Sequence, residues 1–283
     1  MSAVNRRAVA VSFSGGGHLL AYHLGVAHQL KLANVHVDCF AGSSSGAVAA
    51  AVAATSDAQG IQAFMEKHTV QGRSVSGLAH FLADDAHRTA ANNLAISVTD
   101  CGTGANRLLR SFSSTPRMLE AVAASCHIPP SFHPLDFLSA DPRVYPPEEG
   151  RYCEWTAQGG ASRMEDCGEG NFVDGGLSAN IPLVPGCQTA RVSVLSTPDA
   201  RVLAPLDTGG AQGALGQLPV PFSVRLPGTL NMSGLGVYLS LSNLRRVVVA
   251  GAGAPPAVLR KLFTEGQRDC ALRLEASGGV LWA

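Results

Sequence analysis

A short run of glycine and serine is the first feature of this sequence that could carry chemistry. Gly42-Ser-Ser-Ser-Gly46 fits the GxSxG nucleophile elbow, in which small flanking residues tolerate a strained turn from strand to helix. Such a turn lifts the central hydroxyl, here that of Ser44, out of the sheet. Because 31 of the 283 residues are glycine, chance alone produces a match on the order of one time in four. The surrounding sequence must therefore show whether the match is a nucleophile elbow or a chance occurrence.

A serine nucleophile also needs a proton acceptor. In α/β-hydrolases an acid and then a histidine follow the serine along the chain. Here all nine histidines lie between positions 18 and 133, and the late acid in a glycine turn is Asp174, in Phe172-Val-Asp-Gly-Gly176. This order excludes the standard triad. Two alternatives remain, an earlier histidine that reaches Ser44 or a direct Ser44–Asp174 dyad, although Asp-Gly is also a common hairpin signal.

The run Gly15-Gly-Gly17 is a second candidate for chemistry. Glycine amides, unobstructed by side chains, can approach a tetrahedral intermediate closely and form an oxyanion hole, or they can bind phosphate. Leu20 occupies the position of the last glycine of a dinucleotide fingerprint, and the Gly-Lys-Ser/Thr of a Walker loop is absent. A nucleotide site is therefore the minor alternative.

Two strand–turn–helix units would position these motifs. Residues 8–14 are typical of a strand and lead through the glycine run into a helix at 18–32. Residues 35–40 predict a second strand, and an alanine-rich helix follows the elbow to about residue 54. Consecutive units of this kind imply parallel strands with right-handed crossovers, so we expect both glycine turns at one carboxyl edge. The second helix would direct its amides at Ser44.

The rest of the chain continues the α/β pattern. It predicts strands at 93–98 and 191–195, a helix at 116–124 capped by Thr115, and a helix at 255–274. Residues 141–170 indicate a surface excursion, and residues 205–230 are loop-like.

Composition excludes several classes of protein. Lysine plus arginine and aspartate plus glutamate each number 21, so nothing in the overall charge attracts nucleic acid or an anionic bilayer. The seven cysteines have no zinc-like spacing, and an odd number of cysteines without an export signal favours reduced thiols. We find no export signal at the N-terminus, and the apolar run at 39–56 is interrupted by serine and glycine, which disfavours a membrane span.

Four motifs occur in a characteristic order: Ser14-Gly-Gly-Gly17, Tyr22-His-Leu-Gly-Val26, Gly42-Ser-Ser-Ser-Gly46 and Asp174-Gly-Gly176. Together they resemble the patatin-like phospholipase family, specifically its eukaryotic triacylglycerol-lipase-like branch. The similarity extends over most of the chain, through residues 94–100, 124–129, 173–183, 239–244 and 255–274.

The resemblance implies a patatin-like three-layer α/β/α sandwich with a mostly parallel central sheet. We expect a single domain over residues 1–283, with a catalytic core at about 8–200 and a C-terminal extension at about 201–283. Ser44 and Asp174 occupy the positions of the family's catalytic dyad. Gly15, Gly16 and Gly17 match its oxyanion loop, and the amide of Ser45 is a further donor by its position after the nucleophile.

The resemblance also implies an activity. It indicates hydrolysis of fatty-acyl esters in neutral lipids or phospholipids through an acyl-serine intermediate, with no metal or organic cofactor. The expected partner is a lipid substrate, reached by peripheral contact with a membrane or lipid droplet through apolar loops such as 215–226. We expect an intracellular protein, either cytoplasmic or on such a surface, with a protein partner or larger assembly as a further expectation.

Three departures from the family pattern leave open a second, non-catalytic class of function. Leu20 replaces a glycine usual in the family's loop, Ala179 stands where an aspartate often follows the dyad motif, and residues 141–170 look unlike the family. None of these removes a catalytic group. A protein that keeps the fold without the activity, and serves as a scaffold or assembly subunit, would have the same pattern.

Overall fold

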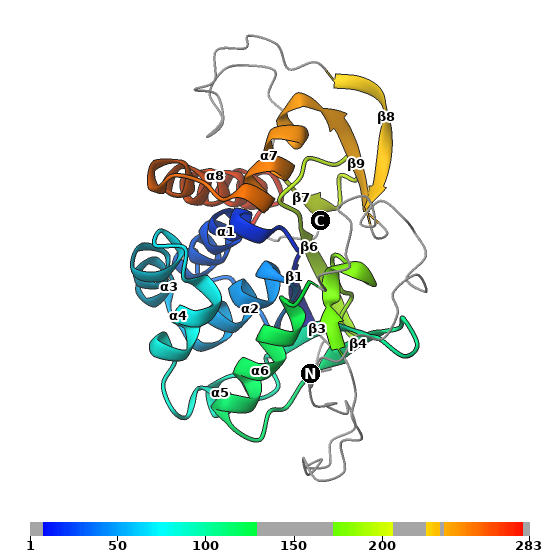
Figure 1. Cartoon of the computed structure of the whole chain (residues 1–283). Helices are drawn as coiled ribbons and strands as arrows, with labels where there is room; N and C mark the ends of the chain where they lie inside the picture. Colours follow the sequence, from blue (N-terminus) through cyan, green and yellow to red (C-terminus); the bar gives the residue numbers. More distant parts are fainter. Residues whose placement is uncertain (1–7, 129–171, 206–224, 233–234, 280–283) are drawn as a thin grey trace, which may run out of the picture.

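A computed structural model describes residues 8–128, 172–205, 225–232 and 235–279. These residues form an α/β structure around a mostly parallel sheet, which confirms the predicted fold class (Figure 1). The strands of the main sheet follow the order β4-β3-β2-β1-β6-β7, and β5 pairs with β3. The strands are β1 (Ala8–Phe13), β2 (Cys39–Ser43), β3 (Leu94–Asp100), β4 (Asn106–Leu109), β5 (Phe172–Asp174), β6 (Cys187–Val192) and β7 (Val202–Leu203).

Two parallel pairings bring the glycine motifs to one edge of the sheet. β1 pairs with β2 so that Phe13 lies opposite Gly42, and both strands therefore end at the same level. The glycine run follows β1 and Ser44 follows β2, as predicted. β2 begins later than expected, at Cys39, because the N–H of Val35 still bonds to the Leu30 carbonyl at the end of the preceding helix.

The short strand β5 pairs with the same edge of β3 as β2 does, beyond the point where β2 ends. β2 pairs with the first part of β3, where Ser43 lies opposite Ser97. β4 covers the other edge of β3 over residues 96–99. β5 runs antiparallel to β3, with Asp174 opposite Val98, so it lies on the β2 edge directly beyond Ser43. This pairing brings Asp174 beside the turn that follows β2.

Most of the helices lie on one face of the sheet (Figure 1). On the opposite face, small buried side chains such as Ala10, Cys39 and Ala41 pack with Val184. No helix in the described part of the chain has the length and apolar character that a membrane crossing requires. The helices are α1 (Leu20–Leu32), α2 (Ser45–Thr55), α3 (Ala58–Phe64), α4 (Ser74–Phe81), α5 (Ala86–Thr89), α6 (Thr115–Ser125), α7 (Leu241–Ala252) and α8 (Pro256–Ala276), with shorter turns η1 (Gly17–Leu19), η2 (Met65–Thr69) and η6 (Gly175–Leu177).

Three further predicted details of secondary structure are wrong. The late strand β6 spans 187–192 instead of 191–195, because it pairs with β1 along the whole length of that strand. The cap of α6 is Ser114, whose hydroxyl accepts the N–H of Arg117, and not Thr115. Part of the expected loop at 205–230 forms β8 (Arg225–Met232), which makes a hairpin with β9 (Leu235–Ser240). Residues 141–170, and residues 215–224 of the apolar loop expected to contact lipid, lie outside the described residues.

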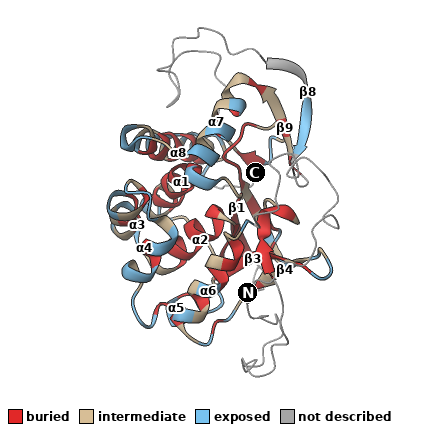
Figure 2. Cartoon of the chain, viewed as in Figure 1, coloured by how far each residue is buried: buried red, intermediate tan, exposed pale blue. Residues whose placement is uncertain are grey.

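The core lies between the sheet and the helices, and α1 is buried almost all round (Figure 2). α8 crosses α1 at two glycines. A Cβ at Gly25 would overlap the carbonyl oxygen of Phe263, and a Cβ at Gly266 would overlap that of Tyr22. Because neither glycine has a side chain, the two backbones approach closely, and the Tyr22 hydroxyl reaches Asp269 on α8 at 3.2 Å.

Replacing Gly266 with alanine is expected to destabilise the protein by about 2–3 kcal/mol, because the added methyl group pushes α8 away from α1. Urea denaturation followed by circular dichroism measures the change in the free energy of unfolding. Gly251→Ala is the matched control, since a Cβ on this helical glycine meets no atom within 4 Å. That exchange should stabilise the protein by up to about 1 kcal/mol. Equal effects of the two substitutions would contradict the close helix crossing.

Candidate active site

Ser44 stands at the sharp turn between β2 and α2. Its backbone angles, φ 52° and ψ −127°, lie where residues other than glycine rarely occur, and such a conformation costs about 1–3 kcal/mol. Ser44 is partly exposed, whereas its neighbours Ser43 and Ser45 are buried. The strand-to-helix elbow that the sequence predicts is therefore present.

Two glycines allow the backbone contacts that hold this turn. A Cβ at Gly42 would overlap the carbonyl oxygen of Gly46, and a Cβ at Gly46 would lie 2.5 Å from the carbonyl oxygen of Ser14 and would overlap that of Phe13. Side chains at these positions would thus separate the end of β1 from the start of α2. Close packing explains both glycines of the GxSxG pattern.

Ser125 anchors the turn from the side of α6. The backbone N–H of Ser44 donates to Ser125 Oγ at 2.8 Å, and the Ser125 hydroxyl donates to the carbonyl of Ser97 at 2.6 Å. Ser125 is fully buried. The strained backbone of Ser44 is therefore fixed by a helix and a strand that are distant in the sequence.

Asp174 ends β5 and is 1% exposed. Its N–H donates to the His127 carbonyl at 2.8 Å, and its own carbonyl accepts the Thr99 hydroxyl at 2.8 Å. Its Oδ1 atom accepts the N–H of Gly176 at 2.7 Å. The chain continues into η6 and not into the hairpin that Asp-Gly can also indicate. Backbone contacts on both sides thus fix the position of this carboxyl group.

Burial raises the pKa of Asp174 from 3.8 to about 7, because a charged carboxylate loses its hydration there. Hydrogen bonding from the Ser44 hydroxyl and the Gly176 amide acts in the opposite direction and lowers this pKa. The contact with Ser44 is loose, since Oδ2 of Asp174 has no partner of ordinary hydrogen-bond geometry among the described residues. Burial, and then the charge of Asp174, raises the pKa of the Cys126 thiol.

The glycine run passes directly beside Ser44. A Cβ at Gly15 would lie 3.4 Å from the Cβ of Ser44, so the two glycine motifs are neighbours, as predicted. The N–H of Gly15 donates to both oxygens of Asn180, at 3.1 Å to the carbonyl and 3.0 Å to Oδ1. The Asn180 carbonyl also accepts the Ser43 hydroxyl at 2.6 Å. The Gly15 amide, one of the predicted oxyanion donors, is therefore already engaged within the protein.

The other predicted oxyanion donors differ in their surroundings. The N–H of Gly16 has no acceptor within the described ranges. Gly17 is exposed and has a φ of 51°, a conformation that favours glycine. Ser45 is the first residue of α2, so its N–H has no partner inside the helix. The positive end of the α2 dipole lies at the same place.

Ser14 fixes the start of the glycine run. Its N–H donates to the Val192 carbonyl at 2.9 Å, and its hydroxyl accepts the N–H of Val194 at 3.3 Å. Its carbonyl accepts from Nε2 of His23 at 2.8 Å. Burial lowers the pKa of His23 to about 3, so the ring is neutral and carries its proton on Nε2. This buried histidine supports the backbone of the glycine run.

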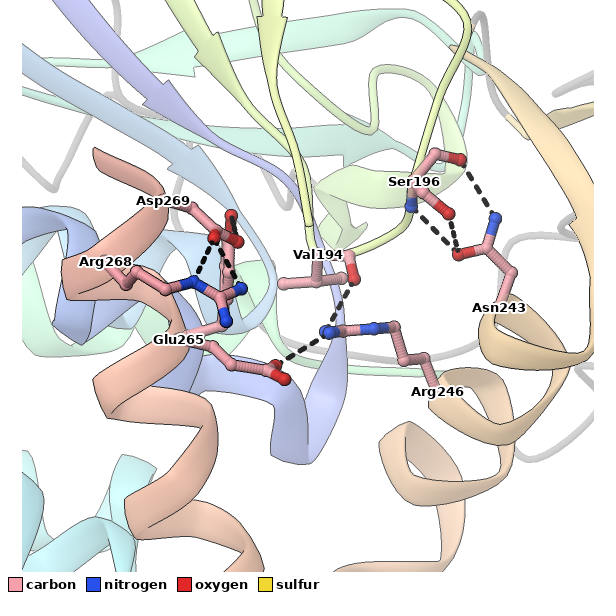
Figure 3. A network of polar contacts seen from close by, with 8 residues as sticks. Val194, Ser196, Asn243, Arg246, Glu265, Arg268 and Asp269 are labelled. Carbon is pink, nitrogen blue, oxygen red and sulfur yellow. Dashed lines mark hydrogen bonds and ion pairs between the residues drawn. The ribbon is translucent and has the colours of Figure 1, made fainter. Parts of the chain in front are cut away.

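A buried ion pair lies behind the glycine run. Arg246 of α7 donates to Glu265 of α8 at 2.8 Å and to the carbonyl of Val194 at 3.3 Å (Figure 3). Both charged side chains are 6% exposed. The side chain of Val194 packs on Gly16, where a Cβ would lie 2.6 Å from Cγ2. The C-terminal helices thus support the glycine run from behind.

Some residues of the site were not predicted from the sequence. Asn180 follows the Asp-Gly-Gly turn, and that proximity is the one signal in the sequence that could have identified it. Ser125 lies in a helix without any motif, and Arg246 and Glu265 are ordinary helical charges in the sequence. Among the residues that the structure describes, no cluster of histidine, cysteine or acidic side chains could hold a metal ion.

Comparison with known proteins confirms the predicted resemblance. The family model for patatin-like phospholipase matches residues 11–71, which include the glycine run and the elbow. Patatin-like phospholipase domain-containing protein 4 of Homo sapiens is 26% identical over 263 residues, which cover 84% of this chain and 85% of that protein. Patatin-like phospholipase domain-containing protein 2 of Rattus norvegicus is 27% identical over 303 residues and 96% of this chain.

The chain spans 52% of the length of the rat relative. Among solved structures, VipD from Legionella pneumophila aligns with a TM-score of 0.40 and 12% identity, over 69% of this chain and 51% of that chain. The family resemblance supports a lipid hydrolase activity in general and does not favour the scaffold alternative.

Glu265→Gln is expected to destabilise the protein by about 3–5 kcal/mol, because it leaves the buried charge of Arg246 without its partner. Chemical denaturation measures the loss. Glu66→Gln removes a carboxylate from the exposed pair with Arg260 and should have little effect. A double variant, Arg246→Met with Glu265→Gln, should recover part of the stability. If Glu265→Gln behaves like Glu66→Gln, the buried pair does not support the fold in this way.

Proposed function

We propose that this protein is a lipid acyl hydrolase in which Ser44 is the nucleophile and Asp174 its proton acceptor. The observation that carries the proposal is the pairing of a strained, partly exposed serine with a buried carboxyl group whose pKa is about 7. A carboxyl group with that pKa can accept and return a proton near neutral pH. The resemblance to patatin-like phospholipases supports an ester of a lipid as the substrate.

The first half of the reaction would form an acyl-serine. Asp174 accepts the proton of the Ser44 hydroxyl while the Ser44 oxygen attacks the carbonyl carbon of the ester. The tetrahedral intermediate then collapses, the bond to the alcohol breaks, and Asp174 returns the proton to the leaving oxygen. In the second half, water attacks the acyl-serine, Asp174 takes its proton and returns it to Ser44, and the fatty acid leaves. The loose contact between the two side chains is compatible with this role, because catalytic hydrogen bonds often tighten once substrate is bound.

The negative oxygen of the intermediate would be stabilised by backbone amides. Gly16, Gly17 and Ser45 are the proposed donors, and the N–H of Gly15 would join them only by leaving Asn180. Each such donor contributes about 3 kcal/mol to lowering the barrier. The neutral His23 bonds to the Ser14 carbonyl, and it would hold the start of this loop without accepting the proton of Ser44.

The substrate would be a fatty-acyl ester of a neutral lipid or phospholipid. Such molecules reside in a lipid phase, so we propose peripheral contact with a membrane or lipid droplet and an intracellular location. The protein would then work at that surface or from the cytoplasm, alone or with a protein partner. The single domain with a core at 8–200 and an extension at 201–283 remains part of this proposal.

Labelling with a fluorophosphonate probe tests the nucleophile. The wild type should be labelled, Ser44→Ala should not, and Asp174→Asn should react about 10²–10⁴ times more slowly because the proton acceptor is lost. Ser113→Ala and Asp84→Asn change the same residue types at exposed positions and should react like the wild type. Labelling that persists in Ser44→Ala, or a folded wild type without labelling, would contradict the proposal.

The rate of labelling should also depend on pH. Below about pH 7 Asp174 is protonated and cannot accept the Ser44 proton, so the rate should fall about tenfold per pH unit on the acid side and level off above the pKa. Stopped assays with the probe over a range of pH give this profile. The residual rate of Asp174→Asn should lack the inflection near pH 7. A wild-type midpoint near pH 4 would mean that Asp174 is not the desolvated acceptor proposed here.

A further inference from the structure

Helix α7 buries two polar side chains and exposes three large apolar ones. Asn243 and Arg246 are 5% exposed each, whereas Leu244, Val247 and Val248 are 60%, 46% and 59% exposed. A helix on the surface of a soluble protein ordinarily has the opposite arrangement. The spacing of 244, 247 and 248 puts the three apolar side chains on one face of the helix, and we call these three residues the outer face of α7.

The two inward polar side chains, Asn243 and Arg246, bond to neighbouring segments, and these bonds fix the orientation of the helix. Asn243 accepts the N–H of Ser196 at 2.9 Å and donates to the carbonyls of Ser196 and Tyr238, both at 2.9 Å. Figure 3 shows Asn243 facing Ser196 and Arg246 facing Val194 and Glu265. Rotating α7 to bury the outer face would break these bonds and leave the buried backbone of Ser196 without the side chain that it bonds to. The contacts of the inner side of α7 therefore keep the outer face at the protein surface.

The outer face lies on the helix that touches the candidate active site. A Cβ at Gly17 would overlap the carbonyl oxygen of Ala250, so α7 packs directly on the glycine run. Two residues earlier in that run, Gly15 lies beside Ser44. Two residues of extended chain span at most about 7 Å. The outer face is consequently separated from the glycine run by the thickness of one helix, about 10–12 Å.

The charge of α7 favours an anionic partner. Over Leu241–Ala252 the sequence contains Arg245 and Arg246 and no acidic residue. Arg246 is used in the buried pair with Glu265, whereas Arg245 is partly exposed and has no ion pair within the described residues. An apolar face flanked by an unpaired cation is complementary to a lipid surface that carries negative head groups.

We propose that the outer face of α7, together with Arg245, docks the protein on an anionic lipid surface and so brings Ser44 to its substrate. The inference rests on the proposed function, because it assigns the surface through which that site reaches a lipid. Leu244, Val247 and Val248 enter the boundary between head groups and acyl chains, and Arg245 remains among the phosphates. The polar face of the same helix keeps the glycine run in place during docking.

Flotation with vesicles tests the docking surface on the intact chain. The wild type should float with vesicles of phosphatidylcholine and phosphatidylserine and less with vesicles of phosphatidylcholine alone. The triple variant Leu244→Gln, Val247→Thr, Val248→Thr should partition at least about tenfold less, because three side chains no longer leave water favourably. Arg245→Gln should remove the preference for phosphatidylserine. Leu32→Gln is the matched control and should float like the wild type, because Leu32 is 56% exposed but lies at the C-terminal end of α1 and not on α7.

Two further measurements separate this inference from the proposed function. Fluorophosphonate labelling in solution reports on Ser44 without any vesicle, and the triple variant should be labelled at the wild-type rate; Ser44→Ala should still float. Flotation of the triple variant equal to the wild type, or no flotation of the wild type, would overturn the docking surface. A wild-type dimer in gel filtration that the triple variant abolishes would overturn it as well, because a second copy would then cover the face. A thermal melting point lowered by several degrees in the triple variant would also overturn it, since the chain itself would then cover these residues.

Discussion

The turn at Ser44 forces one residue into a backbone conformation that only close packing can maintain. Gly46 lets the first turn of α2 rest on the carbonyls of Phe13 and Ser14, and Gly42 lets the end of β2 pass under Gly46. Ser125 then holds the Ser44 amide from the opposite side. These contacts offset the free-energy cost of the strained Ser44 backbone, which is about 1–3 kcal/mol. β1, β2, α2 and α6 must all be in place before the serine can take up its position.

The candidate site also depends on β5, a strand that is distant in sequence from β2 and β3. β5 is three residues long, and it pairs on the edge of β3 just where β2 has turned away. This arrangement puts a buried carboxyl group beside the end of β2 and removes it from water, which raises the pKa of Asp174 to about 7. The property that makes Asp174 suitable as a proton acceptor therefore comes from its burial at the edge of the sheet and not from a neighbouring charge.

Much of this arrangement could be predicted from the sequence, because glycine and strand patterns are local signals. The glycine run, the elbow and the following helices occur where the residues indicate, and the parallel order of β1 and β2 makes the two motifs neighbours. The boundaries of β2 and β6 were missed, since strand ends are set by pairing with other strands. Asn180 and the pair of Arg246 and Glu265 have no local pattern, and their roles depend on contacts between distant segments. The inverted polarity of α7 is likewise invisible until its neighbours are known.

The close crossing of α1 and α8 has a consequence for synthesis of the protein. α1 leaves the ribosome long before α8, which covers one of its faces, and Tyr22 meets Asp269 across 247 positions of sequence. Until α8 emerges, the nascent chain exposes the apolar residues around Gly25 that α8 later covers. The unit that bears Ser44 therefore cannot complete its packing before α8 has been made, and contacts of such long range form slowly. A chaperone that shields apolar segments would have to cover this face of α1 until α8 is made.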